Sequence, residues 1–374
     1  MIIYIILFFF LAIFSFTDYI YTPPLHRKLL LYISGTLIFL VLWALASFKW
    51  KTGTDWNSYY DTFFYFSEAH TINFEPGYIK FMGSIKEYTS SYTIYLTIFS
   101  FLCISFKFSY FFKFHKESFF TLILLFYCYY FADIFAVRQN LAISLTLFST
   151  IFIIKRKPVF FLLLVSLATT IHSSSILYFL AYFIYWTKIK DRTFYYFVVI
   201  SIFFGLGGGG LLIMNLLFKS LGIEGVMGDK IANYLNEDSE IVNTTIDPVF
   251  LYLLGSIKRL VFIPIFIFLK NKTNGKFINI QGYFNLYMTG NIIYFLFAKD
   301  LAVFVRASVP FLFFEIILLS YLLLHFKQAK KKLVIVFFLI VLFSWSRFNA
   351  LVNSYYDLYV PYNSIFDKKI ERQL

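Results

Sequence analysis

Long apolar runs recur along the whole chain and are separated by short clusters of charged residues. A membrane-spanning helix needs about 20 apolar residues, and most of these runs come close to that length. The runs are continuous and lack the two-residue alternation of a lipid-facing strand, so they predict helices and not a β-barrel. We expect twelve spans, at about 2–16, 29–48, 92–112, 118–136, 139–154, 158–171, 173–187, 193–217, 249–269, 281–298, 301–325 and 333–350.

This pattern predicts an all-α polytopic integral membrane protein, with residues 1–374 forming a single membrane domain. Lysine and arginine gather in every second connection, which assigns those connections to the cytoplasm. The two longest connections, 49–91 and 218–248, then lie outside, as do both termini. The basic connections hold Arg27 and Lys28; Lys113 and Lys116; Lys155, Arg156 and Lys157; Lys188, Lys190 and Arg192; Lys270, Lys272 and Lys276; Lys327, Lys330, Lys331 and Lys332.

The composition supports this interpretation. The chain is 60% hydrophobic and only 14% charged, whereas about 25% of the residues of a soluble domain are charged. That excludes a soluble globular enzyme. The net charge of +13 would suggest a nucleic-acid partner in a soluble protein, but here the cytoplasmic lysines and arginines explain much of it. We therefore expect no nucleic-acid partner.

Polar side chains at the outer ends of the helices are the first candidate chemistry. Arg138 and Gln139 lie at the outer junction of two spans, and His172 ends a span on the same side. A guanidinium can hold phosphate oxygens in its planar fork, and a histidine can take the proton of an attacking hydroxyl. The alternatives are an interfacial arginine that reaches water and a structural, hydrogen-bonded histidine.

Two further groups of cations fall within apolar runs. Lys258 and Arg259 lie near the middle of the run at 249–269, which places them at mid-membrane if the run is one straight helix. If 249–256 is a separate re-entrant segment, the pair instead marks the start of a helix that faces a cavity. Arg306 lies inside the outer end of a late span, where an ion pair is the alternative to a functional role. Cations at such depth are costly and usually face a cavity or a partner.

Aromatic residues beside a carboxylate suggest a sugar site. Asp55 and Trp56 follow a glycine turn early in the first long connection, and such a pair can hold a sugar by hydrogen bonds and stacking. Tyr359 and Tyr362 follow the last span, where an aromatic belt is the simpler explanation. No Cys/His ligand spacing is present, so we expect no metal site and no cofactor. The combination suits a lipid-linked, pyrophosphate-activated sugar.

The order of the motifs resembles the EpsG/Wzy-type polysaccharide polymerases. It runs from GTDW and EPGY through VRQNLA and IHSSS to a mid-helix Lys-Arg pair, a late arginine and Y-x-x-x-Y-V-P-Y. The resemblance covers most of the chain. It implies a metal-independent membrane glycosyltransferase of the bacterial inner membrane that joins undecaprenyl-pyrophosphate-linked repeat units into O-antigen of lipopolysaccharide or into exopolysaccharide. A chain-length regulator and a flippase of the same pathway are the implied protein partners, beside the membrane lipids.

The resemblance also implies roles for particular residues. Arg138, Arg259 and Arg306 would bind pyrophosphate, His172 would act as base or orient the acceptor, and Asp55 would contact sugar. Two other functions stay open. A flippase for the same lipid-linked sugar would have a similar cationic cavity but usually two related halves, which we do not find. A polysaccharide O-acyltransferase would also use a histidine and an arginine, but it would need a cytoplasmic acyl donor.

Overall fold

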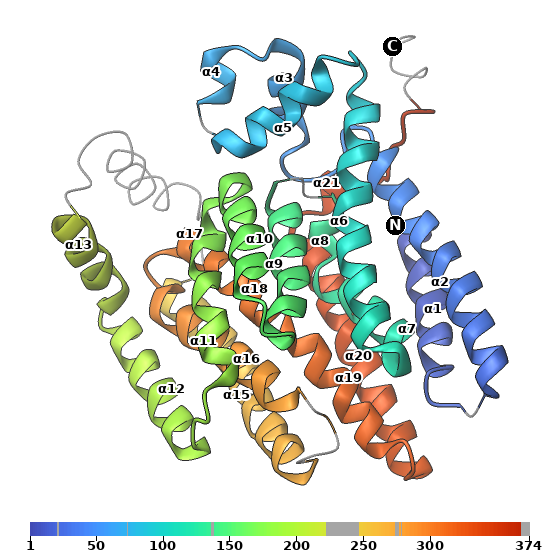
Figure 1. Ribbon diagram of the computed structural model, residues 1–374, viewed down its shortest axis with the longest axis vertical. Coiled ribbons are helices and arrows are strands. Elements are labelled where there is room, and N and C mark those ends of the chain that lie inside the picture. Colours follow the sequence, from blue (N-terminus) through green and yellow to red (C-terminus); the bar gives the residue numbers. More distant parts are fainter. Residues whose placement is uncertain are drawn as a thin grey trace. The chain divides into compact units, whose positions relative to one another are not determined.

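The computed structural model describes residues 1–20, 22–72, 74–135, 138–221, 247–273, 277 and 279–367. In these ranges the regular structure is helical (Figure 1), and the one β-type contact is an isolated antiparallel bridge between Lys49 and Ser364. The chain forms two compact units, which we describe separately. Unit 1 comprises Met1–Ile176 and Leu319–Leu374, and unit 2 comprises Leu177–Leu318.

Five of the described helices are long and apolar enough to cross a membrane, and a sixth span results if one bent helix pair counts as one. The structure is thus all-helical and consistent with a membrane protein, while the full set of twelve spans stays a prediction. Shorter apolar helices occupy several of the remaining predicted spans. The five long ones are Pro24–Ser47, Tyr92–Phe114, Val249–Lys272, Arg306–Phe326 and Lys330–Ser354.

The helices are numbered along the chain. Unit 1 contains α1 (Ile2–Phe16), α2 (Pro24–Ser47), α3 (Trp56–Tyr65), α4 (Glu68–Thr71), α5 (Pro76–Lys86), α6 (Tyr92–Phe114), η1 (Lys116–Ser118), α7 (Phe119–Tyr129), α8 (Phe131–Phe135), α9 (Arg138–Ile154), α10 (Pro158–Ile171), α20 (Lys330–Ser354) and α21 (Tyr356–Tyr359). Unit 2 contains α11 (Ala181–Trp186), α12 (Asp191–Leu206), α13 (Gly209–Leu221), α15 (Pro248–Lys272), α16 (Ile280–Phe297), α17 (Ala302–Val305), η3 (Arg306–Ser308) and α18 (Val309–Leu312). The boundaries between the units fall within η2 (Ser173–Leu180) and α19 (Phe314–Phe326).

Helix α7 is the central element of unit 1. Every one of its residues is buried, as expected of a helix that is apolar around its whole circumference. It packs against α1 and α20, while α6 packs against α2 and α9, and α9 packs against α10. This bundle holds the start of α9 and the end of α10 in fixed positions.

The first long connection folds into a helical layer of its own. It contains α3, α4 and α5, which lie together in Figure 1. Trp56, Tyr59, Phe63, Tyr78 and Met82 are buried and form a core with residues of α6, α9 and α10. The sequence pattern predicted a loop here, because these short helices mix apolar and polar residues and give no long hydrophobic run. The layer packs through α5 on α10.

The segment after α20 returns to the turn that precedes α3. The Trp50 amide donates to the Asn363 carbonyl at 2.8 Å, and the Gly53 amide donates to the Leu358 carbonyl at 2.9 Å. Gly53 has a φ of +105°, a conformation that favours glycine. The GTDW and YVPY motifs, three hundred residues apart in the sequence, therefore meet in one structure.

In unit 2 the central element is α16, which packs against α11, α12, α13, α15, α17, η3 and α18. The predicted span 193–217 is not straight, since α12 and α13 meet at an angle of 87°. Gly208 at this bend has a φ of +81°. The sequence pattern favoured close packing or a kink at the Gly207–Gly210 run, and the structure confirms the kink. Most of the second long connection, 222–246, lies outside the described residues.

Candidate functional site

A carboxylate, an arginine and a histidine meet in unit 1. Glu75 Oε2 accepts from Arg138 Nη1 at 2.6 Å, and Glu75 Oε1 lies 3.2 Å from His172 Nδ1. The Ser173 amide and hydroxyl donate to the same Oε1 at 3.0 and 3.1 Å. Exposed fractions of the side chains are 17% for Glu75, 19% for Arg138 and 9% for His172. The three charged or ionisable groups therefore form one compact, mostly enclosed cluster.

Each member is positioned by the end of a helix. Glu75 is the N-cap of α5, with Pro76 as the first helical residue, a position that proline favours. His172 is the C-cap of α10, and its amide donates to the Ala168 carbonyl at 2.8 Å. A Cβ on Gly77 would lie 2.4 Å from Thr170 Oγ1 and 2.7 Å from the Thr170 carbonyl. Only glycine at this position lets α5 approach the end of α10 so closely.

Arg138 is the first residue of α9. Its guanidinium lies over the ring of Phe74, 4.8 Å from the centroid. The aromatic face of Phe74 and the carboxylate of Glu75 therefore both hold the guanidinium in place. Burial raises the pKa of Tyr59, and the nearby Arg138 charge offsets part of this rise. The arginine side chain is thus oriented by residues of α3 and of the α4–α5 connection.

The electrostatics of the cluster keep Glu75 ionised. Burial raises the pKa of Glu75, but the hydrogen bond to His172, the charge of Arg138 and the Ser173 amide outweigh it and lower the pKa to about 2. A carboxylate that accepts several hydrogen bonds from its surroundings commonly shows this behaviour.

The contact with Glu75 also sets the hydrogen-bonding state of His172. When Nδ1 carries the proton and donates to the carboxylate, Nε2 keeps its lone pair. Nε2 is buried and has no hydrogen-bond partner among the described residues. A histidine held by a carboxylate on one nitrogen and open on the other has the geometry of a general base.

Asp55 and Trp56 occupy different environments from each other. Asp55 is exposed and is the N-cap of α3. The Trp56 ring is only 5% exposed and lies 4.7 Å from the Trp50 ring and 4.6 Å from the Tyr60 ring. Trp56 therefore belongs to the aromatic core of the layer and presents no open ring face, whereas Asp55 can be reached from outside.

Lys49 lies behind the same turn. Its ammonium donates to the carbonyl of Phe135, a residue shortly before Arg138 in the sequence. Burial lowers the pKa of Lys49 to about 7, although the Asp55 carboxylate raises it. Burial also raises the pKa of Tyr59, and the charge of Asp55 adds to that rise. Tyr59 thus feels the charges of both Asp55 and Arg138, which relates the GTDW turn to the Glu75 cluster.

Tyr359 and Tyr362 hold the C-terminal segment in place. Tyr359 is 1% exposed, and its carbonyl accepts from the Tyr4 hydroxyl at 2.9 Å. The Tyr362 hydroxyl donates to the Leu45 carbonyl at 3.0 Å. Both tyrosines join elements from the two ends of the sequence, and Figure 1 shows α21 close to the start of α1 and the end of α2 in unit 1.

The other predicted residues are spread over both units. Gln139 is half-buried beside Arg138 in unit 1. In unit 2, Lys258 and Arg259 lie inside the single helix α15, which agrees with the straight-helix alternative. The Arg259 guanidinium lies 3.3 Å from the centroid of the Tyr294 ring and donates to the Gly255 carbonyl. Arg306 is exposed at the start of η3.

Two further candidate residues, Glu75 and Ser173, are singled out by the structure. Glu75 was one of several acids in the first long connection, and Ser173 was one of three serines after the histidine. The EPGY motif did contain a signal, because an acid before a Pro-Gly pair favours a helix start with a closely packed neighbour. Within the described ranges, no group of three or more His, Cys, Asp or Glu residues is placed to hold a metal ion.

Comparison with known protein families places these residues in context. A model described as the EpsG family matches residues 32–364. That range contains Glu75, Arg138 and His172, and it extends beyond Tyr362 at the C-terminus. No curated protein and no solved structure matches the chain.

Proposed function

Since the chain belongs to the EpsG family, the family of Wzy-type polysaccharide polymerases, we propose that it joins undecaprenyl-pyrophosphate-linked oligosaccharide repeat units into a polysaccharide. The reaction takes place on the extracytoplasmic face of the bacterial inner membrane, on the side of the 49–91 layer. The protein spans the membrane twelve times and needs no metal ion. A flippase delivers the substrate, and a chain-length regulator of the same pathway sets the product length.

The observation that carries the proposal is the Glu75–His172 contact beside Arg138. In the reaction, a sugar hydroxyl of the incoming lipid-linked unit attacks the anomeric carbon of the growing glycan. His172 Nε2 takes the hydroxyl proton as the new glycosidic bond forms. The bond from the anomeric carbon to the pyrophosphate oxygen breaks, and undecaprenyl pyrophosphate leaves with the electron pair. Glu75 orients the imidazole and stabilises the imidazolium that forms.

Arginine beside the base supplies the charge that the leaving group needs. A guanidinium presents its N–H donors in a planar fork that matches phosphate oxygens. Arg138 binds the pyrophosphate as its negative charge develops, with Gln139 next to it. Lys258, Arg259 and Arg306 lie in unit 2, and from the sequence they remain candidates for binding phosphate. Asp55 hydrogen-bonds to sugar, and Trp56, Tyr359 and Tyr362 shape the glycan site from behind.

A glycan ladder tests the proposal directly. A strain without the gene is complemented with wild type, His172→Ala, Arg138→Ala or His70→Ala, and its surface glycan is separated on a gel. His70 is the matched control, because it is an exposed histidine in the same helical layer whose ring bonds to Ser67 and stacks on Tyr65. We expect His172→Ala and Arg138→Ala to lose the ladder and to keep a single repeat unit, while His70→Ala resembles wild type. General-base catalysis is worth about 10²–10⁴-fold in rate.

Other outcomes would point to other functions. Loss of every surface repeat unit would indicate a flippase, and a normal ladder that lacks an ester group would indicate O-acyl transfer. A full ladder from both His172→Ala and Arg138→Ala, at normal protein levels in the membrane, would exclude the proposed site.

A further inference from the structure

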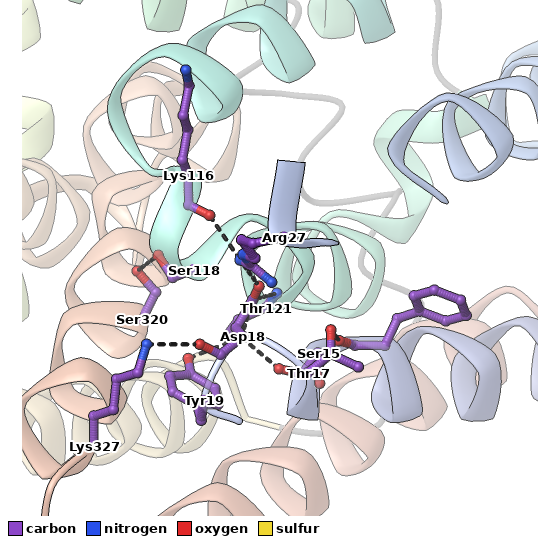
Figure 2. A network of polar contacts seen from close by, with 11 residues as sticks. Ser15, Thr17, Asp18, Tyr19, Arg27, Lys116, Ser118, Thr121, Ser320 and Lys327 are labelled. Carbon is purple, nitrogen blue, oxygen red and sulfur yellow. Dashed lines mark hydrogen bonds and ion pairs between the residues drawn. The ribbon is translucent and has the colours of Figure 1, made fainter. Parts of the chain in front are cut away.

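A second polar network of unit 1 lies where α1 ends and α2, α7 and α20 begin. The Asp18 carboxylate is completely buried. Its Oδ1 accepts from Arg27 Nη2 at 2.6 Å, and its Oδ2 accepts from the Thr121 amide and hydroxyl at 2.8 and 2.9 Å. Figure 2 shows Asp18 at the centre of this network. The connections that meet here are among those that the charge pattern assigns to the cytoplasm.

The same network orients two cations. Arg27 Nη2 also donates to the Lys116 carbonyl at 2.8 Å, and Lys327 Nζ donates to the Asp18 main-chain carbonyl at 3.1 Å. An ammonium has three donors, so Lys327 keeps others for a further acceptor. Figure 2 shows the Lys327 and Arg27 side chains reaching Asp18 from different elements. Asp18 is therefore the structural support that fixes both cations.

Beside these cations is a cavity of about 720 Å³. Its polar lining includes Arg27, Lys327 and Lys330 as cations and Asp18 and Glu117 as acids. Because Asp18 is already engaged by Arg27 and Thr121, the lining keeps an excess of positive charge. Lysines and arginines that serve only to set the membrane orientation would extend into water. They would not have to line one cavity together.

The lining also contains apolar side chains, two of which are exposed. Ile20 is 49% exposed and Val334 is 53% exposed, and both line the cavity together with Phe16 and Leu333. A site that combines cations with exposed aliphatic groups matches a molecule with a phosphate and a hydrocarbon chain. Basic pockets between transmembrane helices on the cytoplasmic side bind anionic lipid headgroups.

We propose that this cavity is a binding site for the phosphate of an anionic membrane phospholipid, held by Lys327 and Lys330 with Arg27 behind them. The acyl chains lie along the exposed Ile20 and Val334. Phosphate is the recognised group, and the exposed aliphatic lining selects a lipid over a free phosphate compound. The site is separate in sequence and in contacts from the Glu75 cluster, so its test does not depend on the polymerase assignment.

The test uses full-length protein purified in a neutral detergent. Native mass spectrometry measures the apparent affinity for phosphatidylglycerol and for zwitterionic phosphatidylcholine. We expect preferential binding of phosphatidylglycerol, which the Lys327→Gln/Lys330→Gln variant weakens by roughly tenfold. The matched control is Lys331→Gln/Lys332→Gln, which removes the same charge from the start of the same helix but changes no residue that lines the cavity. Its affinity is expected to stay within about twofold of wild type.

Further variants separate binding from folding. Lys330 is exposed, so Lys330→Gln alone leaves the Asp18 network intact and still weakens phosphatidylglycerol binding. Lys327→Arg keeps the charge and binds like wild type. Equal losses in both double variants, or equal binding of the two lipids, would overturn the proposal. If glycerol phosphate alone binds as well as phosphatidylglycerol at the same phosphate concentration, the assignment to a lipid is overturned.

Discussion

At the residue scale, Glu75 decides what Arg138 and His172 can do. One of its oxygens bonds to the arginine and the other to the histidine. The carboxylate therefore fixes the position of the guanidinium relative to the imidazole. A lone arginine or a lone histidine would each have to be oriented by other means, at a cost in side-chain entropy.

The first prediction concerns Glu75→Gln. Glutamine keeps the size of the side chain but loses the charge that orients the imidazole, so we expect polymerisation to fall roughly 10–100-fold. The yield of long glycan per unit time, normalised to protein in the membrane, measures the effect. The control is Glu87→Gln, because Glu87 is an exposed acid at the other end of α5. Wild-type yield from Glu75→Gln would contradict the orienting role.

The second prediction concerns pH. The pKa of Glu75 falls from 4.5 to about 2 on folding, so the folded state favours the ionised carboxylate. Its contribution to the free energy of unfolding is complete above pH 4.5 and is lost as the pH falls towards 2. Wild type should exceed Glu75→Gln by on the order of 1 kcal/mol at pH 6, and the two should converge at acidic pH. Urea unfolding of the solubilised proteins at a series of pH values measures this difference, and a gap that widens on acidification would contradict it.

The third prediction concerns the close approach at Gly77. A methyl group there would lie within 3 Å of both the side chain and the carbonyl of Thr170, so Gly77→Ala must push α5 away from α10. We expect this overpacking to lower the free energy of unfolding by about 1–3 kcal/mol. The Glu75–His172 contact should be lost, and the gel should show little long glycan. In Gly83→Ala, on the same helix, the new methyl meets only the far edge of the Phe66 ring. Similar activities for the two variants would argue against this interpretation.

At the element scale, the C-terminal segment completes the outer layer. The Ile365 amide donates to the Phe48 carbonyl at 2.9 Å, and Lys49 and Ser364 form the antiparallel bridge. The segment thus supports the turn from which Lys49 and Asp55 project. Its sequence gave no sign of this contact, because an aromatic-rich tail after a last span also fits an interfacial belt.

The fourth prediction tests that support. Ile365→Pro removes the amide that bonds to Phe48 and should lower both the unfolding midpoint of the solubilised protein and its activity. Ile365→Ala keeps the amide and serves as the control for lost side-chain packing. If the proline and alanine variants behave alike in both assays, the main-chain pairing does not support the turn.

Much of the element list could be predicted from hydropathy, and the reasons for its errors are physical. The runs at 29–48, 92–112 and 333–350 correspond to α2, α6 and α20, because long apolar helices leave a direct mark on the sequence. The break between α7 and α8 left no such mark, since apolar residues continue across it from Phe119 to Phe131. In the site, Arg138 and His172 could be predicted because an ionisable side chain at the end of an apolar helix is energetically unfavourable unless it has a role. Glu75 was missed because an acid in a polar connection costs nothing until it is folded against a partner.

At the scale of the whole molecule, the orientation in the membrane is the property that unites the two functional proposals. The polymerase site is expected on the extracytoplasmic face of the membrane, and the lipid site on its cytoplasmic face. The natural cysteines, Cys103 and Cys128, are both buried and free, so an introduced cysteine can be labelled against a low background.

The fifth prediction uses that background. Tyr88, in the first long connection, is 90% exposed, and a membrane-impermeant maleimide should label Tyr88→Cys in intact spheroplasts. Lys157 is also exposed, and Lys157→Cys should react only after the membrane is permeabilised. The reverse pattern would invert the orientation and would place the Glu75 cluster on the cytoplasmic side.

The burial of α7 has a consequence for how the protein is made. The two helices that it contacts most, α1 and α20, come from the first and the last parts of the chain. While the chain is being synthesised, α7 can pack on α1, but the face that α20 covers stays without its partner. Unit 1 can reach its final packing only after Lys330–Ser354 has left the ribosome. A chain that stops before α20 should therefore be recognised as incomplete and degraded by membrane proteases, even though every residue of the Glu75 cluster has already been translated.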